Sequence, residues 1–258
     1  MGILEKFKLD GKRAFVTGGA RGIGKCITAA LLEAGADVAI VDLDIAEARK
    51  TADELKSIGP KVISVEADVT DQAQVTRMVE EVVSAFGELN VAFCNAGIAL
   101  NEKAEDMTFE QWRKVMAINC DAVFLCAQAA GRQMIRQGRG GSIINTASMS
   151  AHIVNFPQPQ CAYNASKAAV IQLSKSLAVE WVGKNIRVNS ISPGYIATDL
   201  IKNAPNLKAL IEEWKKQCPM GRLGDPEELQ AISVFLASDS SLYTTGSDFI
   251  IDGGFTCV

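Results

Sequence analysis

Two residues, four positions apart, could carry out proton transfer. Tyr163 and Lys167 lie in the stretch CAYNASKAAV (161–170), whose other positions are mostly small or apolar. In a helix, side chains separated by four positions share a face, so the ammonium would lie close to the phenol. A free tyrosine has a pKa of ~10, and a nearby positive charge favours its phenolate form. The pair therefore predicts a phenol that serves as a base near neutral pH.

A glycine-rich turn near the N-terminus predicts a phosphate site. The segment TGGARGIG (17–24) follows a predicted strand and opens a predicted helix, with Gly18, Gly22 and Gly24 in the spacing G-x3-G-x-G. Glycines let the backbone approach a pyrophosphate, and the first turn of a helix offers N–H donors. We interpret this turn as a dinucleotide site, although methyltransferases and structural turns use similar glycines.

The end of the second predicted strand bears on the choice of cofactor. Asp42 comes 42 − 24 = 18 residues after the last glycine of the turn. A carboxylate here can bind both ribose hydroxyls and would repel a 2′-phosphate. Asp44 is the better candidate for capping the next helix. We therefore expect NAD, while Arg21 in the glycine turn leaves NADP as the alternative because it could bind a 2′-phosphate.

The elements that must position these residues alternate along the chain. Apolar strand patterns joined by helical patterns predict a parallel sheet covered on both faces. The expected strands are 13–19, 37–44, 61–70, 89–97, 140–148, 185–194 and 247–254, and the expected helices are 22–36, 45–59, 71–87, 108–137, 162–182 and 226–239. No linker divides residues 1–258, so we expect one doubly wound α/β domain of the Rossmann type. The less regular segment 195–224 is interpreted as a lid over the substrate.

The composition argues against several classes of protein. The chain has 26 basic and 30 acidic residues, a formal charge of −4, and no basic cluster suited to nucleic acid. Its apolar stretches are far shorter than the roughly 20 residues that span a membrane, and no signal-peptide pattern is present, so we expect a cytoplasmic protein. Seven cysteines without a CxxC pattern indicate buried free thiols, and with His152 as the single histidine no metal site is expected.

Further motifs occur in a fixed order along the chain. They are Asp68, NAG (95–97), Asn119, Ser148, YNASK (163–167) and PG (193–194). With the glycine turn, this set resembles the short-chain dehydrogenase/reductase family over essentially the full length. The resemblance implies that Asn119, Ser148, Tyr163 and Lys167 form a catalytic tetrad. Tyr163 would take the hydroxyl proton, Ser148 would bind the substrate oxygen, and Asn119 would kink its helix and hold a water behind Lys167.

The resemblance also implies which residues hold a nicotinamide cofactor. Asp68 and Val69 would contact the adenine, the NAG turn would line the cleft, and Thr198 would contact the carboxamide. The complete expected cofactor set is Gly18, Arg21, Gly22, Ile23, Gly24, Asp42, Asp68, Val69, Asn95, Ala96, Gly97, Tyr163, Lys167, Pro193, Gly194, Ile196 and Thr198.

The substrate is expected between the catalytic residues and the lid. The expected lining set is Ser148, Ser150, Asn155, Gln158, Tyr163 and Tyr195. The neutral amides suit a polyhydroxylated substrate, although a solvated loop explains them about as well. His152 is interpreted as a packed or loop residue because a tyrosine base is already present, and Trp214 is read first as packing and only second as a substrate contact.

A narrower resemblance concerns the substrate. The stretch NFPQPQCAYNASKAAV and the ending DGGFTCV look like the sorbose reductase, mannitol dehydrogenase and sorbitol-utilisation branch of the family. This implies a polyol or ketose substrate. The alternatives are a 3-oxoacyl or other small-ketone reductase and a non-catalytic dinucleotide-binding regulator. The family resemblance further implies a homotetramer, with the helices 108–137 and 162–182 and the last strand at its interfaces.

Overall fold

A single parallel sheet organises the chain. In the computed structural model, which describes residues 2–203 and 207–258, the strand order is β3-β2-β1-β4-β5-β6-β7. The strands are β1 (Arg13–Thr17), β2 (Asp37–Asp42), β3 (Val62–Glu66), β4 (Val91–Cys94), β5 (Gly141–Thr146), β6 (Ile186–Pro193) and β7 (Asp248–Ile251). All neighbouring pairs run parallel. The expected seven-stranded Rossmann sheet is therefore confirmed.

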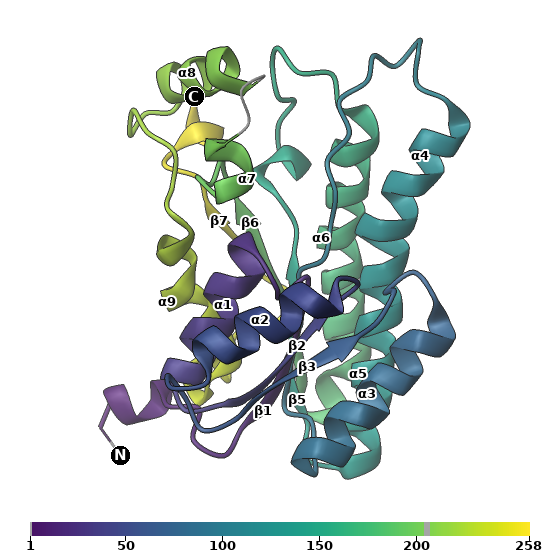
Figure 1. Cartoon of the computed structure of the whole chain (residues 1–258), viewed down its shortest axis with the longest axis vertical. Coiled ribbons are helices and arrows are strands. Elements are labelled where there is room, and N and C mark those ends of the chain that lie inside the picture. Colours follow the sequence, from purple (N-terminus) through teal and green to yellow (C-terminus); the bar gives the residue numbers. More distant parts are fainter. Residues whose placement is uncertain (1, 204–206) are drawn as a thin grey trace.

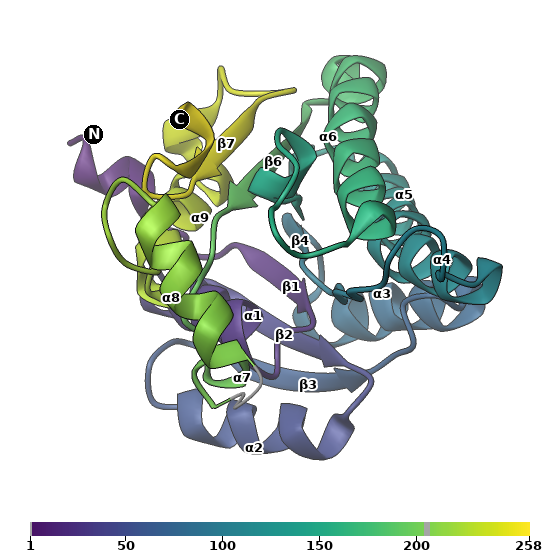
Figure 2. The same cartoon turned by 90° about the horizontal axis from the view of Figure 1, so that it is seen from above.

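Helices cover both faces of this sheet. They are α1 (Gly22–Glu33), α2 (Ile45–Leu55), α3 (Gln72–Phe86), α4 (Phe109–Met116), α5 (Ala122–Gln137), α6 (Cys161–Trp181), α7 (Asp199–Lys202), α8 (Lys208–Gln217) and α9 (Gln230–Ala237). Figures 1 and 2 show α3, α5 and α6 on one face and α1, α2 and α9 on the other. The arrangement requires strands that are apolar on both sides.

Adjacent strand residues supply the two cores. Successive side chains along a strand point to opposite faces. Phe15 packs among residues of α3, α5 and α6, whereas its neighbour Val16 packs among residues of α1 and α9. Ile143 and Ile144 divide in the same way, and all four side chains are fully buried. The continuous apolar runs in the sequence thus follow from burial on both faces.

The helix after β2 begins as the sequence predicts. The carboxylate of Asp44 accepts a hydrogen bond from the backbone N–H of Glu47 at 3.1 Å, which caps α2. Asp42, the last residue of β2, therefore does not cap this helix. The two acids therefore have separate tasks, as expected.

The expected helix 108–137 is divided in three. A π-helical turn, Ala117–Asp121, separates α4 from α5 and contains Asn119. The Asn119 Nδ2 donates to the backbone oxygen of Ile98 at 2.9 Å, and Asn119 Oδ1 accepts from the Ile98 N–H at 2.8 Å. Such turns occur often at functional sites. The helix deviates from α geometry where Asn119 is buried and joined to the segment after β4.

The segment 195–224 is more regular than the sequence suggests. It contains the short helix α7 and the ten-residue helix α8, and Figure 1 shows both beyond the edge of the sheet at which the strands end. Because prolines and glycines are frequent in this segment, the sequence pattern did not predict a helix over KALIEEWKKQ (208–217). Trp214 of α8 is 4% exposed, so tertiary packing holds this helix in place.

Cysteine exposure differs in part from expectation. All seven cysteines are free, but Cys161 and Cys257 are exposed. No helix in the described part of the chain combines the length and the apolar character needed to cross a membrane.

Candidate active site

The predicted site residues lie where the strands end. β1 and β4 are neighbours although β2 and β3 come between them in sequence, so the strand order changes direction here. Ligands of open α/β sheets bind at such a switch point. The side-chain amide of Asn95, which follows β4, donates to the backbone oxygens of Thr17 and Gly18 at 3.2 and 3.3 Å. The two turns beside the switch point are thereby tied together.

The glycine turn is too tight to accept a side chain at Gly24. A Cβ placed there would lie 2.0 Å from the backbone oxygen of Gly18 and 2.7 Å from the Asn95 Nδ2. Gly18 and Gly22 have φ of 61° and 53°, the left-handed region that favours glycine. Glycines therefore leave the backbone at the start of α1 uncovered by side chains, and its N–H groups can bind a pyrophosphate.

The charges next to this turn are arranged around Asp42. Its carboxylate accepts hydrogen bonds from the backbone N–H groups of Ala20 at 3.2 Å and Asp44 at 3.1 Å. Arg21 turns to α2, where its guanidinium lies 2.7 Å from a carboxylate oxygen of Asp44 and 3.7 Å from one of Glu47. The Arg21 charge is thus compensated by two acids of the same neighbourhood.

The remaining predicted cofactor positions are found on the same edge. Asp68 and Val69 follow β3, and one Asp68 oxygen accepts from the Thr70 N–H at 2.9 Å. Pro193 ends β6 and Gly194 follows it. Thr198, still further along, would lie 3.3 Å from a Cβ at Gly22. Segments from four strands therefore meet at one edge.

The four residues of the expected tetrad converge on this edge. Ser148, 6% exposed, follows β5, and Tyr163 and Lys167 lie in the first two turns of α6. The Lys167 Nζ is 5.8 Å from the centre of the Tyr163 ring and donates to the backbone oxygen of Thr146 at 2.7 Å. A Cβ at Gly97 would be 3.3 Å from the Asn119 Oδ1 and 3.4 Å from the Lys167 Nζ.

Burial governs the protonation of the pair. It raises the pKa of Tyr163, against an opposing effect of the Ser148 side chain. It also lowers the pKa of Lys167 to about 8, partly offset by Cys120. The lowered phenol pKa expected from the sequence is therefore wrong for the protein alone, because desolvation outweighs the hydrogen bond with Ser148. A positive charge bound next to Tyr163 would lower the pKa of its phenol.

The expected substrate residues are joined to one another. Asn155 Nδ2 donates to the Tyr195 hydroxyl at 2.9 Å, and Gln160 Nε2 donates to Asn155 Oδ1 at 2.9 Å. Gln158 Oε1 accepts from the indole Nε1 of Trp214 at 2.8 Å. The amides that we expected to bind substrate hydroxyls are thus engaged within the protein. Trp214 packs against them, as its first interpretation held.

His152 is occupied outside this cluster. Its Nε2 lies 2.7 Å from a carboxylate oxygen of Asp248 in β7. The same carboxylate accepts hydrogen bonds from Ser190 at 2.6 Å and Ser192 at 2.8 Å. His152 therefore ties the loop after Ser148 to the last strands, in agreement with a packed or loop role.

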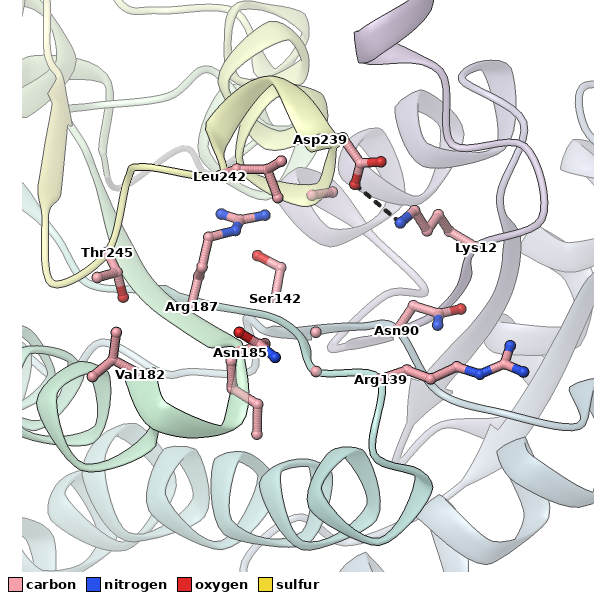
Figure 3. Close-up of a pocket in the computed structure, with 14 residues that line it drawn as sticks. Lys12, Asn90, Arg139, Ser142, Val182, Asn185, Arg187, Asp239, Leu242 and Thr245 are labelled. Atoms are coloured by element: carbon pink, nitrogen blue, oxygen red, sulfur yellow. Dashed lines mark hydrogen bonds and ion pairs between the residues drawn. The ribbon is translucent and has the colours of Figure 1, made fainter.

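A separate cavity lies at the opposite edge, where the strands begin. Its volume is about 400 Å³. Figure 3 shows Arg187, Lys12 and Asp239 among its lining residues. Lys12 binds Asp239 at 3.1 Å, and Arg187 donates to the backbone oxygens of Leu236 and Ser238 near the end of α9. Cations suit the C-terminal end of a helix. None of the predicted site residues lines this cavity.

Three residues support the site without having been predicted. Thr146 supplies the backbone oxygen that binds Lys167, and Ile98 binds the Asn119 amide. Ser166 accepts from Asn119 Nδ2 at 3.1 Å and donates to the backbone oxygen of Tyr163 at 2.7 Å. Backbone groups carry no sequence signal. Ser166 lies within YNASK, where its small size was noted but its hydrogen bonds were not.

The comparisons with known proteins agree with this geometry. The fold and the clustered side chains define a dinucleotide-dependent oxidoreductase. A family model described as enoyl-(acyl carrier protein) reductase matches residues 18–256. A solved short-chain type dehydrogenase/reductase from Mycobacterium marinum has 45% identity and a TM-score of 0.96 over 100% of both chains. The chain belongs to the short-chain dehydrogenase/reductase family, and it is an enzyme that transfers hydride between an alcohol or ketone and a nicotinamide cofactor.

Curated relatives are similar over nearly the whole chain. The sorbose reductase of Candida albicans is 42% identical over 99% of this chain and 90% of its own. A probable NADP-dependent mannitol dehydrogenase of Yarrowia lipolytica is 42% identical over 99% and 91%. The galactitol 2-dehydrogenase of Rhizobium johnstonii is 42% identical over 100% of both. The expected similarity to this branch is thus confirmed, and the comparisons support an enzyme over a non-catalytic regulator.

Proposed function

We propose that the protein reversibly oxidises a secondary hydroxyl of a polyol to a ketose, with NAD as cofactor. The observation that carries this proposal is the convergence of Tyr163, Lys167 and Ser148 at the sheet edge beside the glycine turn, with Lys167 and Ser148 buried and Tyr163 half-buried. The names of the three curated relatives, each for a polyol or a ketose, support that substrate class.

The four tetrad residues divide the chemistry among them. In oxidation, Tyr163 takes the hydroxyl proton, and in reduction it returns the proton. Ser148 hydrogen-bonds the reacting oxygen and stabilises charge as it develops. Lys167 favours the phenolate by its positive charge and binds the nicotinamide ribose, while Asn119 holds a water that relays the proton. The nicotinamide ring, when bound, exchanges the hydride with the substrate carbon.

The charges around Asp42 support NAD. The carboxylates of Asp42, Asp44 and Glu47 gather near the glycine turn, and Arg21 is held by two of them. A 2′-phosphate would meet net negative charge there and would have to displace Arg21 from its partners. The Yarrowia lipolytica relative is named NADP-dependent, so both cofactors belong in the test.

The rest of the proposed cofactor site follows the strand ends. The glycine turn holds the pyrophosphate, and the segments after β3, β4 and β6 hold the adenine and the nicotinamide. The proposed contacts are Gly18, Gly22, Ile23, Gly24, Asp68, Val69, Asn95, Ala96, Gly97, Pro193, Gly194, Ile196 and Thr198. Segment 195–224 is the lid that covers the substrate, and Tyr195 forms part of its inner wall.

A homotetramer and a cytoplasmic location complete the proposal. Apolar side chains of α5 and α6 are exposed, among them Phe124 at 39%, Ile135 at 38% and Val179 at 77%. An apolar surface of this kind suits a contact between copies of the chain. Seven free cysteines fit a reducing compartment. A monomeric mass in light scattering would contradict the tetramer.

The decisive experiment is a substrate panel. The protein is incubated with NAD or NADP and with mannitol, sorbitol, galactitol, simple secondary alcohols and a 3-hydroxyacyl thioester, while the nicotinamide absorbance is followed. We expect reduction of NAD with at least one polyol, at a kcat/KM at least about tenfold above that for simple alcohols. A preference for the thioester would support the small-ketone reductase instead.

A further inference from the structure

Trp214 joins helix α8 to the loop that follows Ser148. Its ring stacks on Tyr195, with ring centres 4.0 Å apart and an angle of 9° between the planes. Its Nε1 donates to Gln158 Oε1 at 2.8 Å. A buried indole N–H needs such an acceptor, and here the acceptor belongs to the loop between β5 and α6. The ring thus contacts two separate segments of the chain.

The hydrogen bonds continue from this indole into the loop. Gln158 Nε2 donates to Gln160 Oε1 at 3.2 Å. Gln160, 6% exposed, directs its Nε2 at Ser150 Oγ at 3.3 Å and at the side-chain oxygens of Asn155 and Asn164 at 2.9 and 2.8 Å. The Gln160 amide has two hydrogens for these three acceptors, so a change at its Oε1 alters which of them it serves.

The path ends at the catalytic serine. The backbone N–H of Ser150 donates to Ser148 Oγ at 3.1 Å. This bond fills one acceptor position of the hydroxyl, so the hydroxyl hydrogen must point elsewhere. Hydrogen bonds therefore lead from Trp214 through Gln158 and Gln160 to the side chain of Ser150, whose backbone N–H in turn donates to Ser148.

We propose that Trp214 is a positioning residue for Ser148 and acts through Gln158, Gln160 and Ser150. Packing of α8 against Tyr195 then fixes the direction in which the serine hydroxyl presents itself to the reacting oxygen. The inference rests on the proposed function, which makes Ser148 the group that binds that oxygen. It also gives the loop amides a task other than substrate binding.

The test uses a variant that removes the indole N–H and keeps an aromatic ring. In Trp214→Phe, stacking on Tyr195 is retained, while Gln158 loses its partner. We expect kcat to fall about fivefold to tenfold, as for the loss of one buried hydrogen bond, with KM changed less than about twofold. Trp181→Phe is the matched control. Trp181 lies 181 − 163 = 18 residues along α6, about 27 Å away along the axis, and should leave kcat unchanged.

Two readouts separate positioning from a structural role. The Ser148 side chain lowers the pKa of Tyr163, so a displaced serine should move the acid limb of the kcat profile for alcohol oxidation to higher pH in Trp214→Phe. In addition, Trp214→Phe combined with Gln158→Met should cost no more than the larger single change, because both interrupt one path. Additive losses, or an unshifted profile, would overturn the proposal.

A third measurement does not require turnover. Hydrogen exchange of the Ser150 amide, which is protected by Ser148 Oγ, should accelerate about fivefold in Trp214→Phe and stay unchanged in Trp181→Phe. Faster exchange in a protein that oxidises no alcohol would contradict the proposed function but leave the link between Trp214 and Ser148 standing. Unchanged exchange would overturn the inference even if polyols are good substrates.

Discussion

The guanidinium of Arg21 lies 2.7 Å from the carboxylate of Asp44, and this contact directs the only cation of the turn TGGARGIG away from Asp42. Because Arg21 is paired with Asp44 and Glu47, it would have to leave these partners before it could bind a 2′-phosphate. Asp42 remains as the acid whose removal tests the proposed preference for NAD.

Asp42→Ser should therefore shift the enzyme towards NADP. Removal of this carboxylate takes away the nearest repulsion of a 2′-phosphate, and the hydroxyl can donate to it. We expect the ratio of kcat/KM for NADP to that for NAD to rise at least about tenfold, or ~1.4 kcal/mol. Asp53→Ser, which removes an equally negative but exposed side chain from α2, is the control and should leave the ratio unchanged.

Tyr163→Phe should remove activity and spare cofactor binding. The phenyl ring preserves the packing, but no group remains to take the hydroxyl proton, and acid–base catalysis contributes about 10²–10⁴-fold. We expect kcat to fall at least ~10³-fold, while fluorescence titration with NADH gives a dissociation constant within about twofold of the unmodified protein. Tyr243→Phe, at a fully exposed tyrosine, should behave like the unmodified protein. Substantial turnover in Tyr163→Phe would contradict the assignment of the base.

Lys167 should make the stability depend on alkaline pH. Burial lowers the pKa of Lys167 to about 8 in the folded protein, whereas the unfolded chain has the ordinary pKa of 10.5. Between these values the unfolded state binds more protons, so the free energy of unfolding rises with pH. Relative to Lys167→Met, the unmodified protein should gain up to about 3 kcal/mol from pH 7 to pH 11. Urea titrations across this range measure the gain.

The control for the lysine prediction lies on the same helix. Lys175 of α6 is exposed, so Lys175→Met should give a difference from the unmodified protein that does not change between pH 7 and pH 11. A flat difference for Lys167→Met as well would show that burial does not depress the pKa of that ammonium.

Gly24→Ala should weaken both the fold and the cofactor site. The added methyl group would lie 2.0 Å from the Gly18 oxygen, so the turn has to open. Overpacking of this kind costs about 1–3 kcal/mol, and we expect a corresponding fall in the free energy of unfolding with at least about tenfold weaker NADH binding. Gly183→Ala places its methyl in open space and serves as the control. Unchanged NADH affinity in Gly24→Ala would argue against a pyrophosphate at this turn.

Much of the fold could be predicted because burial on both faces leaves a strong signal. Runs such as the one containing Phe15 and Val16 are apolar throughout, and this identifies the strands. Helix α8 was missed because its residues form a stable helix mainly through Trp214, whose packing partners are distant in sequence. Local patterns do not report such contacts.

The sequence predicted which residues form the candidate site, but it did not predict the pKa shifts of Tyr163 and Lys167. The spacing of Tyr163 and Lys167 places them on one face of a helix, but it does not reveal how deeply both are buried. The loop containing Asn155 and Gln158 has no periodic pattern. The sequence therefore could not predict that its amides bind other side chains of the protein.

Near the C-terminus, Phe255 packs against Tyr195. Phe255 meets the Tyr195 ring edge-on, with centres 5.3 Å apart, and it shares a buried cluster with Met149 and Cys218. Figure 1 shows the N-terminus at the other end of the molecule. An affinity tag or reporter domain is therefore better fused in front of the first residue, because an extension behind Val258 would be attached three residues from the buried Phe255 and could disturb its packing on Tyr195.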